Sequence, residues 1–197
     1  MITLYGPNGQ PLKVSSRNEL VTSDAFSEAV SRGRVFSVAN QVGVASQAGL
    51  SVTTPVLSLV NFPKSGVKGK LWYAGCTFEV VFAAVAAIWL AAGGGVLSTI
   101  AGTRTVAERN LKSIGSIAGN VIKPYLAATL PVVPVGIALL GHGLTGAVTT
   151  VPGQLPYGRW FNGAVRIEEA TNLSIQTSTA SGATGMWCEY IWEEEDS

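Results

Sequence analysis

The feature that most constrains the fold is a period of two in the C-terminal third of the chain. Met186, Cys188 and Trp192 belong to a run of large apolar residues at alternate positions, and the segments 165–168 and 173–176 alternate between apolar and polar residues. Because successive side chains of a β-strand point to opposite faces, each segment is predicted to be a strand. Glycine, asparagine and serine separate the segments, so this region predicts an antiparallel sandwich or barrel.

The middle of the chain has the same β character. Segments 35–38 and 56–60 are short β-branched runs, and 71–89 predicts one long strand or two strands with a bend. A buried helix over residues 82–92 is the alternative, because the alanines there permit it. About eight such strands fit within residues 34–197, which is typical of a jelly roll. The predicted fold class is therefore all-β, an antiparallel β-sandwich of jelly-roll type.

The first 33 residues are predicted to precede the sandwich as an N-terminal arm, a polar linker and one short helix. Asn8-Gly9 is a strong turn signal because both residues tolerate positive φ. Residues 1–14 are therefore expected to form an exposed arm or a small hairpin.

Two segments have apolar residues at helical spacing. Residues 24–32 are predicted to form a short helix, capped by Ser23 and stopped by Gly33. The segment 103–119 contains a cluster of charges, and a crossover loop is favoured there over a second short helix.

Charge is scarce, at 13% of residues with a formal net charge of +1. The low charge indicates either a surface covered by partner chains or a β protein with a polar, uncharged outer face, and both readings stay open. The 13 lysines and arginines are scattered, which argues against a nucleic-acid partner, since phosphate binding needs clustered cations. Glu189 and the acidic residues 193–196 are expected to form a solvated tail.

Two uncharged apolar stretches, 80–103 and 126–151, are long enough to cross a bilayer. Glycines 93–95 interrupt the first stretch, and Pro131 and Pro134 break the helix that the second would need. No secretory signal of the charged-then-apolar form follows Met1. No membrane association is therefore expected.

The inventory of reactive residues predicts that the chain is not an enzyme. Asp24 and Asp196 are the only aspartates, and the only histidine, His142, lies in a glycine-rich segment that predicts a loop. No Gly-x-Ser-x-Gly pentapeptide occurs, and the adjacent Glu168 and Glu169 are expected on opposite faces of a strand. Two cysteines and one histidine do not complete a zinc site, so neither a metal nor a cofactor is expected.

Two questions stay open at this point. Cys76 and Cys188 lie in apolar stretches, where a free cysteine packs as a small apolar residue, and the sequence does not decide whether they pair. Aromatic residues crowd the C-terminal third, where period-two spacing favours core positions over an exposed sugar-binding platform. These aromatic residues are Trp160, Phe161, Trp187, Tyr190 and Trp192.

Several short motifs point to a known family. They are Gly33-Arg34-Val35-Phe36-Ser37-Val38, Leu59-Val60-Asn61, Ser65-Gly66, Lys70-Leu71 and Tyr190-Ile191-Trp192-Glu193-Glu194. With them, residues 33–195 resemble the jelly-roll cement proteins, also called decoration or auxiliary head proteins, of tailed bacteriophages and cyanophages. The loop 61–70 departs from the family's pattern, because its proline is displaced and it contains extra residues.

The resemblance implies a structural protein of the virion that assembles in the host cytoplasm and ends on the outside of the capsid. Its expected partners are the major capsid protein, whose neighbouring subunits it would clamp, and other copies of itself, most often as a homotrimer. The arm is the expected capsid contact, since an extended segment can add a strand to a neighbour's sheet. The contact residues expected in it are Leu4, Tyr5, Pro7, Asn8, Pro11 and Leu12. The alternatives are a glycan-binding jelly roll of a phage tail or fibre and another capsid or connector subunit.

Overall fold

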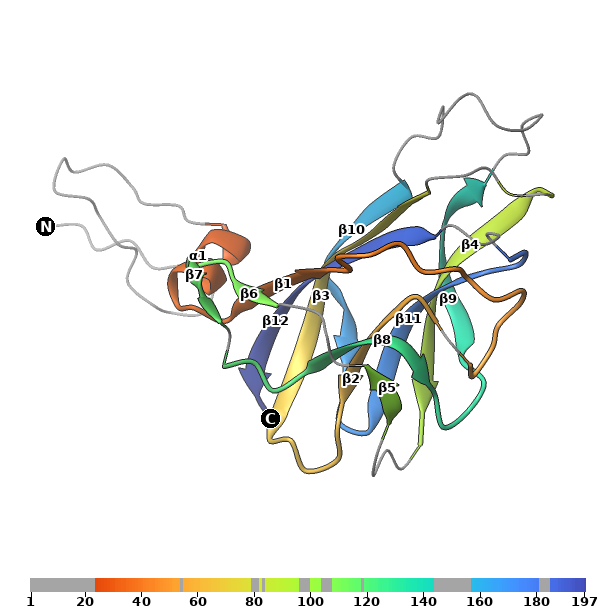
Figure 1. Ribbon diagram of the computed structural model, residues 1–197. Coiled ribbons are helices and arrows are strands. Elements are labelled where there is room, and N and C mark those ends of the chain that lie inside the picture. Colours follow the sequence, from red (N-terminus) through yellow and green to blue (C-terminus); the bar gives the residue numbers. More distant parts are fainter. Residues whose placement is uncertain are drawn as a thin grey trace, which may run out of the picture.

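The chain folds into an all-β sandwich of two antiparallel sheets that pack face to face (Figure 1). The computed structural model describes residues 24–53, 55–78, 82, 84–95, 100–103, 108–117, 119–143, 157–180 and 185–197. One helix, α1 (Ala25–Ser31), precedes the strands in this part of the chain.

Within the described residues, each sheet has six strands. Sheet I has the order β10 (Tyr157–Ile167), β3 (Val67–Phe78), β12 (Met186–Asp196), β1 (Val35–Ala39), β6 (Arg109–Asn110) and β7 (Ser113–Ile117). Sheet II has the order β5 (Ala101–Thr103), β8 (Lys123–Thr129), β2 (Leu57–Asn61), β11 (Thr171–Thr177), β4 (Ala86–Gly94) and β9 (Val135–Gly143).

The strand order is that of a jelly roll, as the sequence predicted. Without β5 to β8, the remaining eight strands alternate between the two sheets in the jelly-roll manner. The first, eighth, third and sixth are neighbours in sheet I, and the second, seventh, fourth and fifth are neighbours in sheet II.

An insertion between β4 and β9 supplies the four extra strands. Its hairpin of β6 and β7 joins β1 at one edge of sheet I, while β5 and β8 join β2 at an edge of sheet II. The insertion therefore extends both sheets at one side of the sandwich, and β10 and β9 are the edge strands at the other side.

The core lies between the sheets and is built from alternate residues, as the period of two requires. On β12, Met186, Cys188, Tyr190 and Trp192 all point inward and are almost completely buried. The Tyr190 hydroxyl, which burial would leave without water, donates a hydrogen bond of 3.1 Å to the carbonyl of Leu57 on the facing sheet. Inward-facing residues of this kind each contribute roughly 1.5–3 kcal/mol through burial.

Three local predictions need correction. The run 71–89 forms two strands, β3 and β4, so the alternative of a buried helix over residues 82–92 is wrong. The described part of 103–119 forms the β6–β7 hairpin, because pairing with β1 satisfies its backbone, and the favoured loop is wrong there. Helix α1 is capped by Asp24, whose carboxylate accepts a hydrogen bond of 2.7 Å from the Ser27 amide, and not by Ser23.

The acidic tail is the largest correction. β12 continues to Asp196 and pairs with β3 along its whole length, so the tail is a central strand and not a solvated appendage. Glu193 and Glu194 are 2% and 8% exposed. Cations and backbone amides from other elements stabilise these carboxylates, and that compensation is visible only in three dimensions.

Candidate functional site

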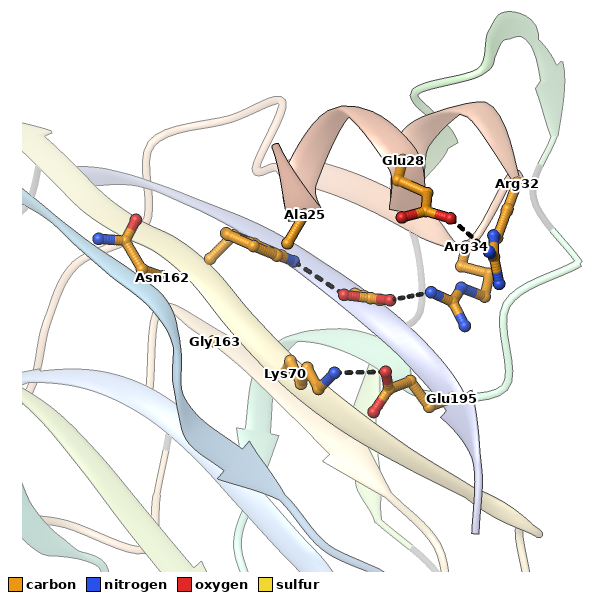
Figure 2. Close-up of a pocket in the computed structure, with 10 residues that line it drawn as sticks. Ala25, Glu28, Arg32, Arg34, Lys70, Asn162, Gly163 and Glu195 are labelled. Atoms are coloured by element: carbon orange, nitrogen blue, oxygen red, sulfur yellow. Dashed lines mark hydrogen bonds and ion pairs between the residues drawn. The ribbon is translucent and has the colours of Figure 1, made fainter. Parts of the chain in front are cut away.

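A charged pocket of about 260 Å³ lies on the outer face of sheet I, beneath helix α1 (Figure 2). Local backbone irregularities create this space. β10 leaves its ladder with β3 between Trp160 and Val165, where Asn162 and Gly163 adopt positive φ and line the pocket. The other lining residues are Ala25, Glu28, Arg32, Arg34, Lys70, Trp72, Glu193 and Glu195.

The buried carboxylate of Glu193 organises one side of the pocket. It lies 2.7 Å from the Arg34 guanidinium and accepts a hydrogen bond of 3.3 Å from the Trp72 indole. Arg34 comes from the segment before β1, Trp72 from β3 and Glu193 from β12, so the ion pair connects three parts of the sheet. The pair satisfies a charge that would be costly to bury alone.

A second ion pair occupies the other side. Glu195 contacts Lys70 (Figure 2). It also lies 3.3 Å from Arg166 of β10. Partial burial raises the pKa of Glu195, but the hydrogen bond from Lys70 and the charges of Lys70 and Arg166 outweigh it and hold the pKa below its usual value. On the rim, Glu28 of α1 pairs with Arg32 one turn later.

The pocket is therefore a set of paired charges. Glu28, Glu193 and Glu195 each contact a basic side chain. Because the pKa of Glu195 is held below its usual value, this carboxylate is a poor proton donor at neutral pH. The ion pairs of Glu193 and Glu195 join the end of β12 to β3, to β10 and to the segment before β1.

A different surface lies on sheet II, at the edge strand β9. Ala138 and Leu140 of β9 pack against the core, and Leu139 between them points outward; two register shifts interrupt the simple alternation along the rest of the strand. Leu139 is paired in register with Trp89 of β4, and the Trp89 ring lies over Gly136. The five large apolar residues here are 42–66% exposed, and we call them the β9 surface: Val132, Val133, Val135, Ile137 and Leu139.

Charge is distributed very unevenly between the sheets. Among the residues of the described strands, sheet II has one charged residue, Lys123, whereas sheet I has ten. The ten are Lys68, Lys70, Arg109, Arg159, Arg166, Glu189, Glu193, Glu194, Glu195 and Asp196. The low charge of the composition is thus a property of one half of the molecule, and the β9 surface lies in that half.

An aromatic cluster lies beside the charged pocket on sheet I. Trp160 is 53% exposed and stacks against Tyr73, with ring centroids 5.2 Å apart, and against the edge of Phe26 from α1. Burial, and then the neighbouring Glu189 carboxylate, raises the pKa of Tyr73. Of the other C-terminal aromatics, Phe161, Tyr190 and Trp192 are core residues, as expected. The expectation is wrong for Trp160, which is exposed, and for Trp187, which is partly buried outside the core cluster.

The residues considered for chemistry lie apart from one another in the fold. His142 is exposed on strand β9 and not in a loop, because its backbone pairs with Ala87. Glu168 and Glu169 follow β10 in a turn, so their expected placement on a strand is wrong. Glu169 accepts hydrogen bonds from the amides of Lys64 and Gly66, 3.0 and 2.9 Å long, and so fixes the loop after β2.

The part of the chain described by the structure holds no group of three histidine, cysteine, aspartate or glutamate residues that could bind a metal ion. The six residues expected in the capsid-contact arm, Leu4, Tyr5, Pro7, Asn8, Pro11 and Leu12, lie outside the described residues. Among the described elements there is no helix with the length and apolar character that a bilayer span requires.

Comparisons of the chain with known protein families, curated proteins and solved structures find no match. The site is therefore interpreted from its own geometry.

The β9 surface was not identified from the sequence, although a signal for it exists. Residues 124–158 contain no lysine, arginine, aspartate or glutamate, and Val135, Ile137 and Leu139 within them have the spacing of one strand face. The stretch was considered as a membrane span and not as a strand. Its exposure depends on β9 being an edge strand, which the local sequence does not encode.

Proposed function

We propose that this chain is a non-enzymatic structural protein of a virus particle, which binds the outside of a tailed-phage head as an oligomer and clamps neighbouring capsid subunits. The observation that carries the proposal is the contrast between a charged sheet and a nearly uncharged sheet whose free edge exposes the β9 surface. A contiguous exposed apolar patch is typical of a protein–protein contact. The jelly-roll fold, common in capsid proteins, supports the same reading.

The partner we assign to the β9 surface is a second copy of this chain. β9 is hydrogen-bonded to β4 on one side and is the last of the described strands of its sheet, so we expect its other side to accept a further strand. Antiparallel pairing of two β9 strands about Ala138 sets Ile137 of one copy opposite Leu139 of the other. Since the strand has no charged residue, such self-pairing involves no repulsion between like charges.

Because the β9 surface is assigned to self-association, we assign binding of the capsid to the N-terminal arm. An oligomer that places several arms on one shell gains avidity, because each contact after the first is effectively intramolecular. Weak individual contacts are then sufficient for stable decoration.

The oligomer is tested by measuring the mass of the purified protein in solution by light scattering. Wild type is expected to contain more than one copy, and Val135→Asp is expected to be monomeric. Val42→Asp is the matched control, because Val42 is also well exposed but lies in the segment after β1. Two-fold β9 pairing requires an even number of copies; a wild-type trimer would contradict this pairing while leaving the decoration role intact.

The decoration role is tested by mixing the protein with undecorated phage heads and sedimenting them. The full chain is expected to co-sediment, and a variant lacking residues 1–14 is expected to bind more weakly with an unchanged circular-dichroism spectrum. Failure of the full chain to bind any tested head would count against the proposed function. Equal binding by the truncated chain would refute only the role of the arm.

A second candidate function, glycan binding, is favoured by one observation, the exposed Trp160 ring beside Tyr73. Aromatic faces of this kind stack on sugar rings. If the chain binds glycans here, oligosaccharides are expected to quench tryptophan fluorescence in wild type and not in Trp160→Ala. Quenching that persists in the variant, or is absent in wild type, would exclude this site.

A further inference from the structure

The two cysteines of the chain are direct cross-strand neighbours. Cys76 of β3 is opposite Cys188 of β12 in the antiparallel register, both are buried, and both are free thiols. They lie on the inward face of sheet I, in the core cluster. Residues that are 112 positions apart in sequence are thus side by side at the centre of one sheet.

The hydrogen bonds of Cys188 show which kind of pair this is. Its carbonyl accepts a hydrogen bond of 3.2 Å from the Asn40 amide, and its own amide donates to the side-chain oxygen of Asn40. Both backbone groups therefore point toward the β1 side of the strand and away from Cys76. The two cysteines form a non-hydrogen-bonded pair, in which the Cα atoms of antiparallel strands are about 4.5 Å apart.

This separation lies within the range that disulfides require, roughly 4.4–6.8 Å between Cα atoms. Pairs of this type also bring their side chains closer together than hydrogen-bonded pairs do. A thiol one position further along either strand would not meet the second condition, because its side chain would point to the outer face of the sheet.

The pair lies close to the surface, although little of it is exposed: Cys76 is 3% and Cys188 is 1% exposed. Both cysteines line a half-open pocket of about 180 Å³, together with Ala39, Asn40, Thr77, Trp187 and Glu189. The thiols react slowly, because burial, followed by the Glu189 charge, raises the pKa of Cys76 to about 12. Burial and the neighbouring Cys76 also raise the pKa of Cys188. Since the thiolate is the reacting species, the reduced form persists until an oxidant is supplied.

We propose that Cys76 and Cys188 are a latent disulfide site, which closes within the folded sandwich when a low-molecular-weight disulfide such as oxidised glutathione is present. One cysteine thiolate attacks the glutathione disulfide, forms a mixed disulfide and releases one glutathione thiolate. The second cysteine thiolate attacks the protein sulfur of that mixed disulfide and displaces the other glutathione. The two protein thiols together lose two protons and two electrons, and the oxidant gains both as two glutathione thiols.

Closure would covalently join β3 and β12, two neighbouring strands in the interior of sheet I. The new bond closes a chain loop that includes most of the sandwich, and cross-links over long loops restrict the unfolded chain most. The expected consequence is a protein that becomes harder to unfold once it has been oxidised. This inference does not depend on the proposed function.

The test is oxidation of the native protein with oxidised glutathione at mildly alkaline pH. Both thiols are expected to disappear from titration in denaturant, and the intact mass is expected to fall by two hydrogen atoms. A tryptic map is expected to contain one peptide pair linked through Cys76 and Cys188, and the urea midpoint of the oxidised protein is expected to rise. Persistence of both thiols, a stable glutathione adduct without closure, or a lower urea midpoint would overturn the proposal.

A variant with the thiol moved by one residue tests whether disulfide formation depends on the strand register or only on the length of the chain between the two cysteines. In the double variant Cys76→Ser, Thr77→Cys the loop between the cysteines has nearly the same length, but the new thiol points to the outer face. When folded, the double variant is expected not to form a disulfide. In denaturant, it is expected to form one as readily as wild type. Closure of the native variant at the wild-type rate would show that register is irrelevant. Circular dichroism of each variant verifies that it is folded.

Discussion

The outer faces of the two sheets differ in the kind of side chain that they expose and in whether these side chains have partners within the chain. On sheet I, Glu193 and Glu195 are paired with basic residues from β3, β10 and the segment before β1, and helix α1 packs on the same side. On sheet II, the β9 surface presents valine, isoleucine and leucine side chains with no residue of the described chain to bury them. The carboxylates of Glu193 and Glu195 on sheet I are paired within the chain, whereas among the described strands sheet II ends at the unpaired edge of β9.

The contrast shows that a low average charge can conceal two different surfaces. The charged residues are concentrated where they stabilise the chain's own fold, and they are absent where association would bury them. Substitutions on sheet I should therefore change the stability of the single chain, and substitutions on the β9 surface should change its association.

The largest expected effect is on sheet I, at Glu194. Its buried carboxylate accepts hydrogen bonds from the amides of Val121 and Ile122, both 2.8 Å, and from the Trp192 indole, 3.1 Å. Glu194→Ala leaves three donors without a partner, those of Ile122 and Trp192 buried and that of Val121 partly buried, so the free energy of unfolding is expected to fall by about 3–5 kcal/mol. Urea denaturation measures this loss. Asp196→Ala, at the exposed end of the same strand, serves as the control, and an equal loss there would contradict the assignment.

A smaller effect is expected at the Glu193–Arg34 ion pair. Glu193→Gln keeps the shape but removes the charge, and Arg34 is exposed enough for water to solvate it, so the expected loss is about 1–2 kcal/mol. A double-mutant cycle with Arg34→Met isolates the coupling between the two residues. A coupling energy near zero would show that the pair does not stabilise sheet I.

Two neighbouring glutamates are expected to give stability opposite dependences on pH. Burial raises the pKa of Glu194 above its ordinary value of 4.5 in spite of its hydrogen bonds, so protonation favours the folded state and the penalty for its charge disappears as the pH falls. The pKa of Glu195 lies below 4.5, so its contribution is present above that value and is lost as the pH falls through the folded-state pKa.

The measurement is urea denaturation of Glu194→Gln, Glu195→Gln and wild type between neutral and acidic pH. The advantage of wild type over Glu195→Gln is expected to shrink toward acidic pH. The difference between wild type and Glu194→Gln is expected to shift in favour of wild type over the same range. Parallel pH profiles for the two variants would contradict the opposite environments of these carboxylates.

The smallest effect on stability is expected on the β9 surface. Ile137→Lys changes an exposed side chain, so the free energy of unfolding of the dilute monomer is expected to stay within about 0.5 kcal/mol of wild type. Association, followed by the mass in solution, is expected to be lost. A variant that is strongly destabilised but still associates would contradict the assignment of association, and not stability, to the β9 surface.

The sequence predicted the parts of the fold that depend on local periodicity. The alternation of Met186, Cys188, Tyr190 and Trp192 identified the core face of β12, because a strand's two faces follow directly from its sequence. It did not predict the burial of Glu194, since the amides that stabilise this carboxylate belong to residues 121 and 122, in the insertion. Pairing partners at such separations are set by topology.

The candidate site was predicted less well for the same reason. The exposure of Val135 depends on which strand is last in sheet II, and the opposition of Cys76 and Cys188 depends on the register between β3 and β12. Neither the edge position of β9 nor the register between β3 and β12 can be predicted from the residues of one strand alone. The arm residues, from Leu4 to Leu12, remain a prediction.

The central place of β12 in sheet I also determines when the protein can fold. β1 and β3 are not neighbours; each is hydrogen-bonded to β12, the last of the described strands to be synthesised. During translation, the apolar faces of the earlier strands therefore stay exposed until residues 186–196 have left the ribosome. Such long-range closure makes folding slow and leaves nascent chains prone to aggregation, so production of the protein should depend on chaperones and on modest synthesis rates.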